Sequence, residues 1–193
     1  MAEYSFLTTW EVDAPIQQVW AVIADSARYP EWWRYVASVE ELSSGDEQGV
    51  GRTQRTRWTS ALPYGFVFET RVERIEPPHL IELGASGELA GRGRWELSET
   101  AGGTRVRYTW QVRTTKPWMN LAAPLLRPAA LWNHDVLMTE GGQALARRLG
   151  ARLLRNESGT AGSANDQLIG PLLAGFALGA SLTLVARQVL RRR

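Results

Sequence analysis

Few side chains in this sequence are of the types that perform catalysis or bind metals. The chain has 193 residues, no cysteine and only two histidines, His79 and His134. The lack of cysteine excludes disulfides, thiolate metal sites and a cysteine nucleophile, and two histidines are too few for a histidine-rich metal site. We therefore predict neither a metal site nor a cofactor.

His134 is the first candidate for acid–base chemistry, because the charge of a histidine changes near neutral pH. It shares the apolar stripe of a predicted helix with Met138, so both should face the interior. Asp135 points about a third of a helical turn away and cannot easily orient the imidazole. The alternative is a structural histidine near the start of the helix, bonded to a backbone carbonyl.

Arg55 and Arg57 are candidates for binding an oxygen-rich group. Both fall on one face of a predicted strand, with Trp58 on the other face. If their face points inward, the guanidinium groups could bind an acyl oxygen or a carboxylate. A solvated outer face is the alternative, and Gly49 and Gly51 permit a bulge that leaves the register open.

Aromatic side chains form the largest candidate ligand-binding group. The chain holds nine tryptophans, none of them after residue 132. Alternation along the predicted strands places one set of rings on a single face, where they would either enclose a flat apolar ligand or fill the core. This set is Trp58, Phe66, Phe68, Trp95, Tyr108 and Trp110.

A curved sheet and a helix are needed to bring these residues together. Alternation and turn residues predict about seven strands, at 4–12, 35–42, 51–59, 65–76, 79–86, 89–98 and 104–113. Short links between them indicate antiparallel neighbours. Helical spacing predicts a helix at 16–23, a short helical turn before Pro30 and a long helix at 129–154.

Glycines interrupt the long predicted helix at Gly141 and Gly142. Each glycine costs about 1 kcal/mol relative to alanine in a helix interior. The missing side chains either allow close packing against the sheet or leave room for a ligand, and we favour close packing. Trp32 and Trp33 are expected to wedge the short helix onto the sheet.

Composition changes after residue 155. Residues 156–167 are small and polar, which predicts a flexible linker. Residues 168–186 carry no charge and would reach about 28 Å as a helix, so we predict a membrane helix. The alternatives are a helix packed on the preceding domain and one lying in the membrane interface. Gly175 and Gly179 form a GxxxG pattern that could join two chains in a homodimer, and a basic tail follows at 187–193.

The sequence predicts membrane association but does not fix the orientation of the hydrophobic segment in the membrane. Arginines flank the hydrophobic segment on both sides, so the positive-inside rule does not orient it. The N-terminus lacks the pattern of a secretory signal, which favours a cytoplasmic N-terminal domain. The net charge of only +2 argues against a nucleic-acid partner.

Two segments near the N-terminus resemble a known family. Residues 19–25 (VWAVIAD) and 29–33 (YPEWW) resemble the beginning of the polyketide cyclase/dehydrase-like branch of the START/Bet v 1-like (SRPBCC) superfamily. Residues 132–135 (WNHD) resemble the start of its last helix. The resemblance covers residues 1–155 and implies an α+β helix-grip fold, in which a curved antiparallel sheet wraps a long C-terminal helix.

The resemblance carries no catalytic residue with it, so two functions stay open. One is a membrane-tethered module that binds an apolar small molecule or lipid in an aromatic cavity. The other is a polyketide cyclase-like enzyme, with His134 as acid or base and Tyr108 or an inward arginine stabilising an enolate. A third hypothesis is a chaperone-like or envelope-stress component without a small ligand, which a cavity closed by side chains would favour.

Overall fold

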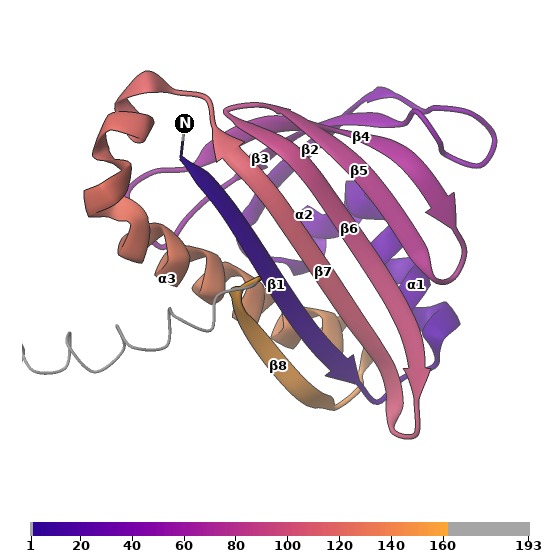
Figure 1. Cartoon of the computed structure of the whole chain (residues 1–193). Helices are drawn as coiled ribbons and strands as arrows, with labels where there is room; N and C mark the ends of the chain where they lie inside the picture. Colours follow the sequence, from indigo (N-terminus) through magenta and orange to yellow (C-terminus); the bar gives the residue numbers. More distant parts are fainter. Residues whose placement is uncertain (1, 162–193) are drawn as a thin grey trace, which may run out of the picture. The chain divides into compact units, whose positions relative to one another are not determined.

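The computed structural model describes residues 2–161, apart from the side chains of 118–124 and 126, as an antiparallel sheet with helices against its inner face (Figure 1). The elements are β1 (Glu3–Val12), α1 (Ile16–Ala24), the 3-10 turn η1 (Ser26–Arg28), α2 (Tyr29–Trp32), β2 (Val36–Ser43), β3 (Thr53–Trp58), β4 (Phe66–Glu76), β5 (Leu80–Gly87), β6 (Leu89–Thr100), β7 (Gly103–Thr114), α3 (Pro117–Leu149) and β8 (Leu153–Thr160). This arrangement confirms the predicted α+β helix-grip fold.

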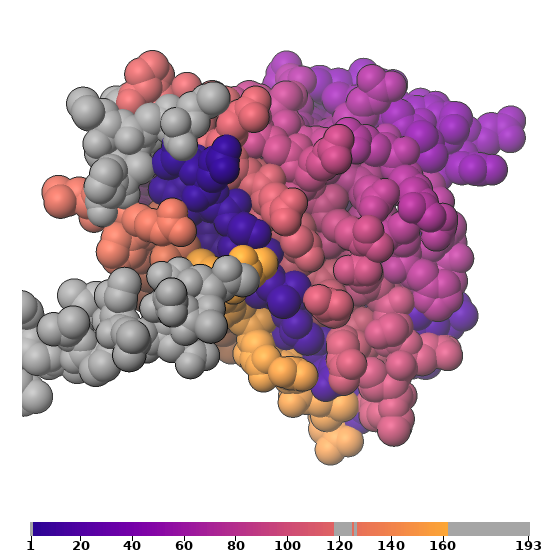
Figure 2. Space-filling model, viewed as in Figure 1, coloured from indigo at the N-terminus to yellow at the C-terminus, as the bar shows by residue number. Residues whose placement is uncertain are grey.

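The sheet has eight strands in the order β2-β3-β4-β5-β6-β7-β1-β8. Strands β2 to β7 follow one another as antiparallel neighbours, and β1 returns to pair with β7 along its whole length, from Glu3 opposite Arg113 to Val12 opposite Thr104. The space-filling view of the outer face shows β1, in indigo, between β7 and β8 (Figure 2). The N-terminal strand therefore lies inside the sheet and not at its edge.

Alternation along the strands separates a buried face from an exposed one. In β1 the side chains of Phe6, Trp10 and Val12 are buried, and in β7 those of Val106 and Trp110. Trp10 is fully buried, and its ring lies edge-on to that of Trp33, which directly follows α2. The buried side chains of these strands therefore all fall at alternate positions, as the period-two alternation in the sequence predicts.

Close packing of α3 explains its two interior glycines. A Cβ atom on Gly141 would lie 2.4 Å from Cζ2 of Trp33, and one on Gly142 would lie 2.8 Å from Cδ1 of Trp10. Trp33 also donates a hydrogen bond from Nε1 to the carbonyl of Leu137 at 3.1 Å. The glycines therefore admit two tryptophan rings, which confirms close packing and the wedge predicted for Trp33.

The boundaries of the last helix and of the linker differ from the prediction. Helix α3 begins at Pro117, well before residue 129, and ends at Leu149 because Gly150 adopts a left-handed conformation with φ +61°. The chain then forms β8, which pairs with the free edge of β1 from Val12 opposite Leu153 to Phe6 opposite Thr160. Residues 156–160, predicted as part of a flexible linker, are therefore a paired edge strand.

The remaining predictions for the C-terminal segment lie outside the described residues. These are the rest of the linker, the membrane helix at 168–186 with Gly175 and Gly179, and the basic tail at 187–193. Within 2–161, none of the helices combines the length and apolar character needed to cross a membrane.

Candidate functional site

A cavity of about 230 Å³, here called the first chamber, lies between the inner face of the sheet, the loop at 59–65 and α3. Its walls are predominantly aromatic and aliphatic. They include the predicted residues Trp58, Phe66, Phe68, Tyr108, Trp110, His134 and Met138, together with Tyr4, Phe6, Leu62, Leu89, Val112, Ala129, Ala130 and Leu137. The structure thus brings most of the predicted ligand-binding set to one apolar space.

A second chamber of about 80 Å³ lies beside the first, between the sheet and the region of α1, η1 and α2. Trp58, Phe68 and Tyr108 line both chambers and so stand between them. Trp95, which was predicted with the ligand-binding set, lines the second chamber and not the first. Its wall carries several polar side chains, among them the guanidinium of an arginine: Ser26, Arg52, Gln54, Thr56 and Thr70.

Stacked rings give the boundary between the chambers a fixed shape. The ring of Tyr108 lies 3.9 Å from Trp95, centroid to centroid, and 5.8 Å from Trp110. Phe68 lies 5.7 Å from Trp110 on the neighbouring side. Offset and tilted aromatic contacts of this kind stabilise the rings in place, so the cavity wall is preorganised rather than assembled by a ligand.

His134 lies within α3, and not near its start as predicted. Its ring stacks on Phe6 at 3.7 Å with an interplanar angle of 9°. Nδ1 lies 3.4 Å from Oγ of Ser158, which in turn lies 3.2 Å from the hydroxyl of Thr8, so its partner is a hydroxyl of β8 rather than a backbone carbonyl. Among the described residues, Nε2 is buried without a hydrogen-bond partner.

Burial controls the protonation of both predicted catalytic residues, His134 and Tyr108. Desolvation lowers the pKa of His134 to about 3, so the imidazole is neutral and weakly basic at neutral pH. Desolvation, with a smaller contribution from Tyr29, raises the pKa of Tyr108 well above its usual value, so its hydroxyl keeps its proton. Tyr108 is therefore a hydrogen-bond donor at this site, and neither residue is tuned to remove a proton near pH 7.

Arg55 and Arg57 point away from the cavity, so their predicted role as ligand-binding residues is wrong. Both side chains are exposed on the outer face of β3. Arg55 forms ion pairs with Glu69 at 2.9 Å and with Glu40 at 3.4 Å. The alternation of β3 fixes this outcome, because Trp58 on the opposite face lines the cavity.

Sequence reasoning missed the polar residues that do face inward. Gln54 and Thr56 alternate with the two outward arginines along β3. Assigning Arg55 and Arg57 to the outer face would therefore have placed Gln54 and Thr56 on the inner face. Asn133 on α3 was also missed: its Oδ1 accepts hydrogen bonds from Oγ of Ser60 at 2.7 Å and from the amide of Ala61 at 3.0 Å. It thereby holds the 59–65 loop, which borders the first chamber, against the helix.

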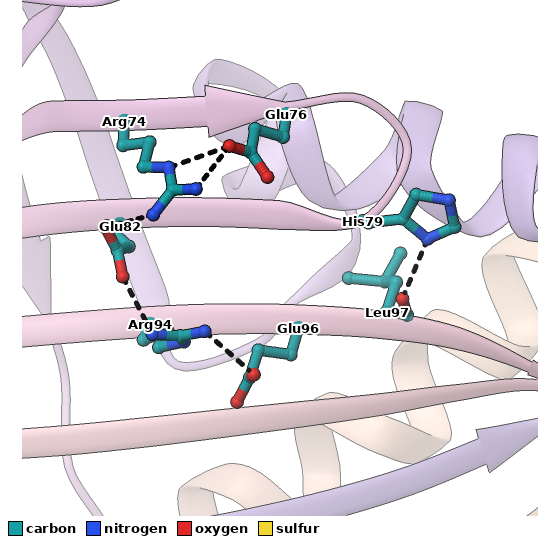
Figure 3. A network of polar contacts seen from close by, with 7 residues as sticks. All are labelled: Arg74, Glu76, His79, Glu82, Arg94, Glu96 and Leu97. Atoms are coloured by element: carbon teal, nitrogen blue, oxygen red, sulfur yellow. Dashed lines mark hydrogen bonds and ion pairs between the residues drawn. The ribbon is translucent and has the colours of Figure 1, made fainter.

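The outer face carries a separate cluster of charged residues, drawn in Figure 3. Arg94 bridges Glu82 at 2.9 Å and Glu96 at 3.1 Å, and Arg74 lies between Glu76 at 2.5 Å and Glu82 at 3.9 Å. His79 is oriented by a contact between Nδ1 and the carbonyl of Leu97 at 3.1 Å. These arginines already have counter-charges, and no group of metal-binding side chains exists among the residues that the structure describes.

Solved structures confirm the fold. Two aromatase/cyclases align with this chain: the di-domain BexL, with a TM-score of 0.62, 18% identity and coverage of 78% of this chain, and Zhui from a Streptomyces species, with a TM-score of 0.58, 17% identity and 77% coverage. A protein from Thermus thermophilus aligns with a TM-score of 0.57, 17% identity and 76% coverage. The alignments span 51%, 93% and 99% of those three chains, so this chain matches about half of BexL.

Family membership rests on the sequence itself. No curated protein matches the chain. Residues 4–150, however, match the family model described as polyketide cyclase / dehydrase and lipid transport. That range contains all the residues that line the two chambers, and it includes the segments whose resemblance was noted in the sequence. The chain belongs to the polyketide cyclase/dehydrase and lipid transport family.

Proposed function

We propose that this chain binds an apolar small molecule or lipid in the first chamber. The observation that supports this most directly is an aromatic-lined cavity of about 230 Å³ on the inner face of the sheet. Together with the second chamber, it reaches the lower end of the range of about 300–1,000 Å³ that is usual for ligand pockets. An open cavity of this kind also argues against the chaperone-like alternative, which a space filled by side chains would favour.

Binding is better supported than catalysis. A cyclase would need a group that accepts a proton from its substrate near neutral pH, and burial makes His134 a weak base with a pKa of about 3. The cyclase alternative rests on the family name and on Tyr108, whose protonated hydroxyl could stabilise an enolate. If a poly-ketone substrate is turned over and Tyr108→Phe abolishes that turnover, the enzyme hypothesis replaces the binding hypothesis.

Filling the first chamber tests the proposal. Ala130 lines this chamber, and the substitution Ala130→Trp would occupy much of its volume. Ala37, exposed on β2, provides the matched control Ala37→Trp. Titration of the full-length chain with a fluorescent apolar probe should show at least a tenfold loss of affinity for A130W and no change for A37W, with unchanged far-UV circular dichroism in both. Equal binding by A130W and the wild-type chain would show that the chamber is not the site.

The membrane tether is part of the same proposal. Residues 168–186 carry no charge, and confinement to a membrane would raise the effective concentration of a lipid ligand. We propose that the ligand-binding domain lies on the cytoplasmic side of the membrane and that two chains can form a homodimer through Gly175 and Gly179. In membrane fractionation, the full chain should sediment with membranes and the variant L178R/L182R should become soluble. Unchanged sedimentation of the variant would overturn the tether.

A further inference from the structure

Among the described residues, Arg52 is the one arginine that is partly buried and has no counter-charge. Among the described residues, every arginine except Arg52 and Arg105 is largely exposed. Arg105 pairs with Glu11 at 2.8 Å, but no described carboxylate lies within 4.0 Å of Arg52. A partly buried guanidinium without an anion is unfavourable, so the second chamber, which Arg52 lines, is electrostatically incomplete.

Other donors around the second chamber are also unsatisfied. Gln54 is 4% exposed, and its Nε2 has no acceptor among the described residues. The same holds for Nε of Arg52 and for Nε1 of Trp58. Buried donors are almost always hydrogen-bonded in folded proteins, so several unpaired donors around one small cavity indicate a missing acceptor.

The donors are held in place by their remaining contacts. Arg52 donates from Nη2 to the carbonyl of Ala24 at 3.0 Å, which fixes the guanidinium and leaves Nε free. Ser26 donates to Oε1 of Gln54 at 2.6 Å, which fixes the amide and leaves Nε2 free. A group with several acceptor lone pairs and a negative charge would satisfy both side chains at once.

We propose that the second chamber binds the carboxylate of an apolar acid whose hydrocarbon or aromatic body occupies the first chamber. Arg52 supplies the counter-charge and Gln54 the amide donor, while Trp58 and Tyr108 stand at the boundary where head and body meet. The chamber volume of about 80 Å³ suits a carboxylate and not a bulky headgroup. This inference rests on the proposed function and names the class of ligand for it.

A matched pair of probes tests the carboxylate preference. Decanoate and 1-decanol have the same body and differ in the head, so calorimetric titration of the full-length chain with each isolates the contribution of the second chamber. We expect the wild-type chain to bind decanoate at least tenfold more tightly than 1-decanol. Arg52→Met, which keeps the length of the side chain, should abolish this preference for decanoate. Gln54→Leu should reduce it. Arg55→Met on the outer face should leave it unchanged.

Carbon NMR of the wild-type complex makes the test independent of how the variants fold. The carboxyl carbon of labelled decanoate should titrate at a lower pH when bound than when free, because the guanidinium favours the ionised form. A raised titration midpoint, or equal affinity for both probes, would overturn the carboxylate site while leaving apolar binding intact. Absence of binding by either probe, combined with an indifferent A130W variant, would overturn the proposed function itself.

Discussion

The two faces of the sheet use arginine in opposite ways. On the outer face of β3, Arg55 is exposed and reaches two glutamates, Glu40 and Glu69. Three residues earlier in the chain, Arg52 is partly buried beside the second chamber and reaches only the carbonyl of Ala24. Residue type alone therefore does not locate a binding group. What distinguishes Arg52 is that its guanidinium is partly buried and still has no carboxylate within 4.0 Å among the described residues.

The same contrast holds for the two faces as a whole. The outer network of Figure 3 alternates arginine and glutamate across β4, β5 and β6, so each charge is compensated and solvated. The inner face combines packed aromatic rings with buried polar atoms that have no partner among the described residues. Exposed ion pairs contribute little to stability, whereas unpaired buried donors are costly, so the inner face is where a ligand has most to contribute.

The largest expected effect concerns His134 of α3, whose ring packs on Phe6 of the inner face. Its pKa is lowered from 6.5 to about 3 on folding, so between these pH values the unfolded chain binds a proton that the folded chain does not. Stability should therefore fall as the pH is lowered through this window, by about 2–4 kcal/mol in total from His134. Urea unfolding from pH 7 to 4 should show a steeper loss for the wild-type chain than for His134→Gln.

The second histidine provides the control for that experiment. His79→Gln on the outer side leaves His134 in place and should keep the wild-type pH dependence. If His134→Gln and the wild-type chain lose stability in parallel, His134 is not the buried neutral group described here, and the distinction between a desolvated inner face and a hydrated outer face is weakened.

Close packing of α3 leads to the next effect. Gly141→Ala gains helix propensity but places its methyl group against the ring of Trp33 at 2.4 Å. Because overpacking of a filled core is destabilising, we expect the free energy of unfolding to fall by about 1–3 kcal/mol. Gly159→Ala in β8 has nothing within 4 Å of the new Cβ and should change the stability by less than about 0.5 kcal/mol. A stable G141A variant would mean that the helix–sheet contact can relax.

Much of the fold could be predicted because its strands alternate strongly. Each predicted strand lies within a few residues of an observed one, since apolar residues such as Trp10 or Val106 point consistently to one side. Strand β8 was missed because its small polar residues are only half-buried at the edge of the sheet and pair through their backbone. The first turns of α3 were missed because Pro124 and Pro128 lie within it, where prolines are usually unfavourable.

The site was predicted in its apolar part and not in its polar part. Rings such as Phe68 and Trp110 follow directly from strand alternation, and they line the first chamber. The inward position of Gln54 depends on the register of β3, which the glycines before it left open. The unpaired state of Arg52 depends on which carboxylates the fold brings near it, and that is a tertiary property which no local pattern contains.

A smaller effect is expected where the 59–65 loop is held to α3. Asn133→Ala removes the acceptor of two hydrogen bonds, from Ser60 and from the amide of Ala61. We expect a loss of about 1 kcal/mol in unfolding free energy and faster hydrogen exchange at the Ala61 amide. Ser60→Ala also removes the acceptor of the Leu62 amide at 2.9 Å, but it leaves the bond from the Ala61 amide to Asn133 in place, so exchange at Ala61 should rise less than in N133A. Unchanged exchange at Ala61 in N133A would show that the loop is held by its apolar contacts instead.

The smallest effect is expected on the outer face. Arg55→Ala removes two exposed ion pairs, and the melting temperature should change by no more than about 2 °C, with any change vanishing at high salt. Affinity for an apolar acid should not change, because Arg55 lies on the far side of the sheet from both chambers. A large loss of affinity in R55A would place part of the binding energy on the outer face. Partial burial without a counter-charge would then no longer distinguish a binding arginine from a structural one.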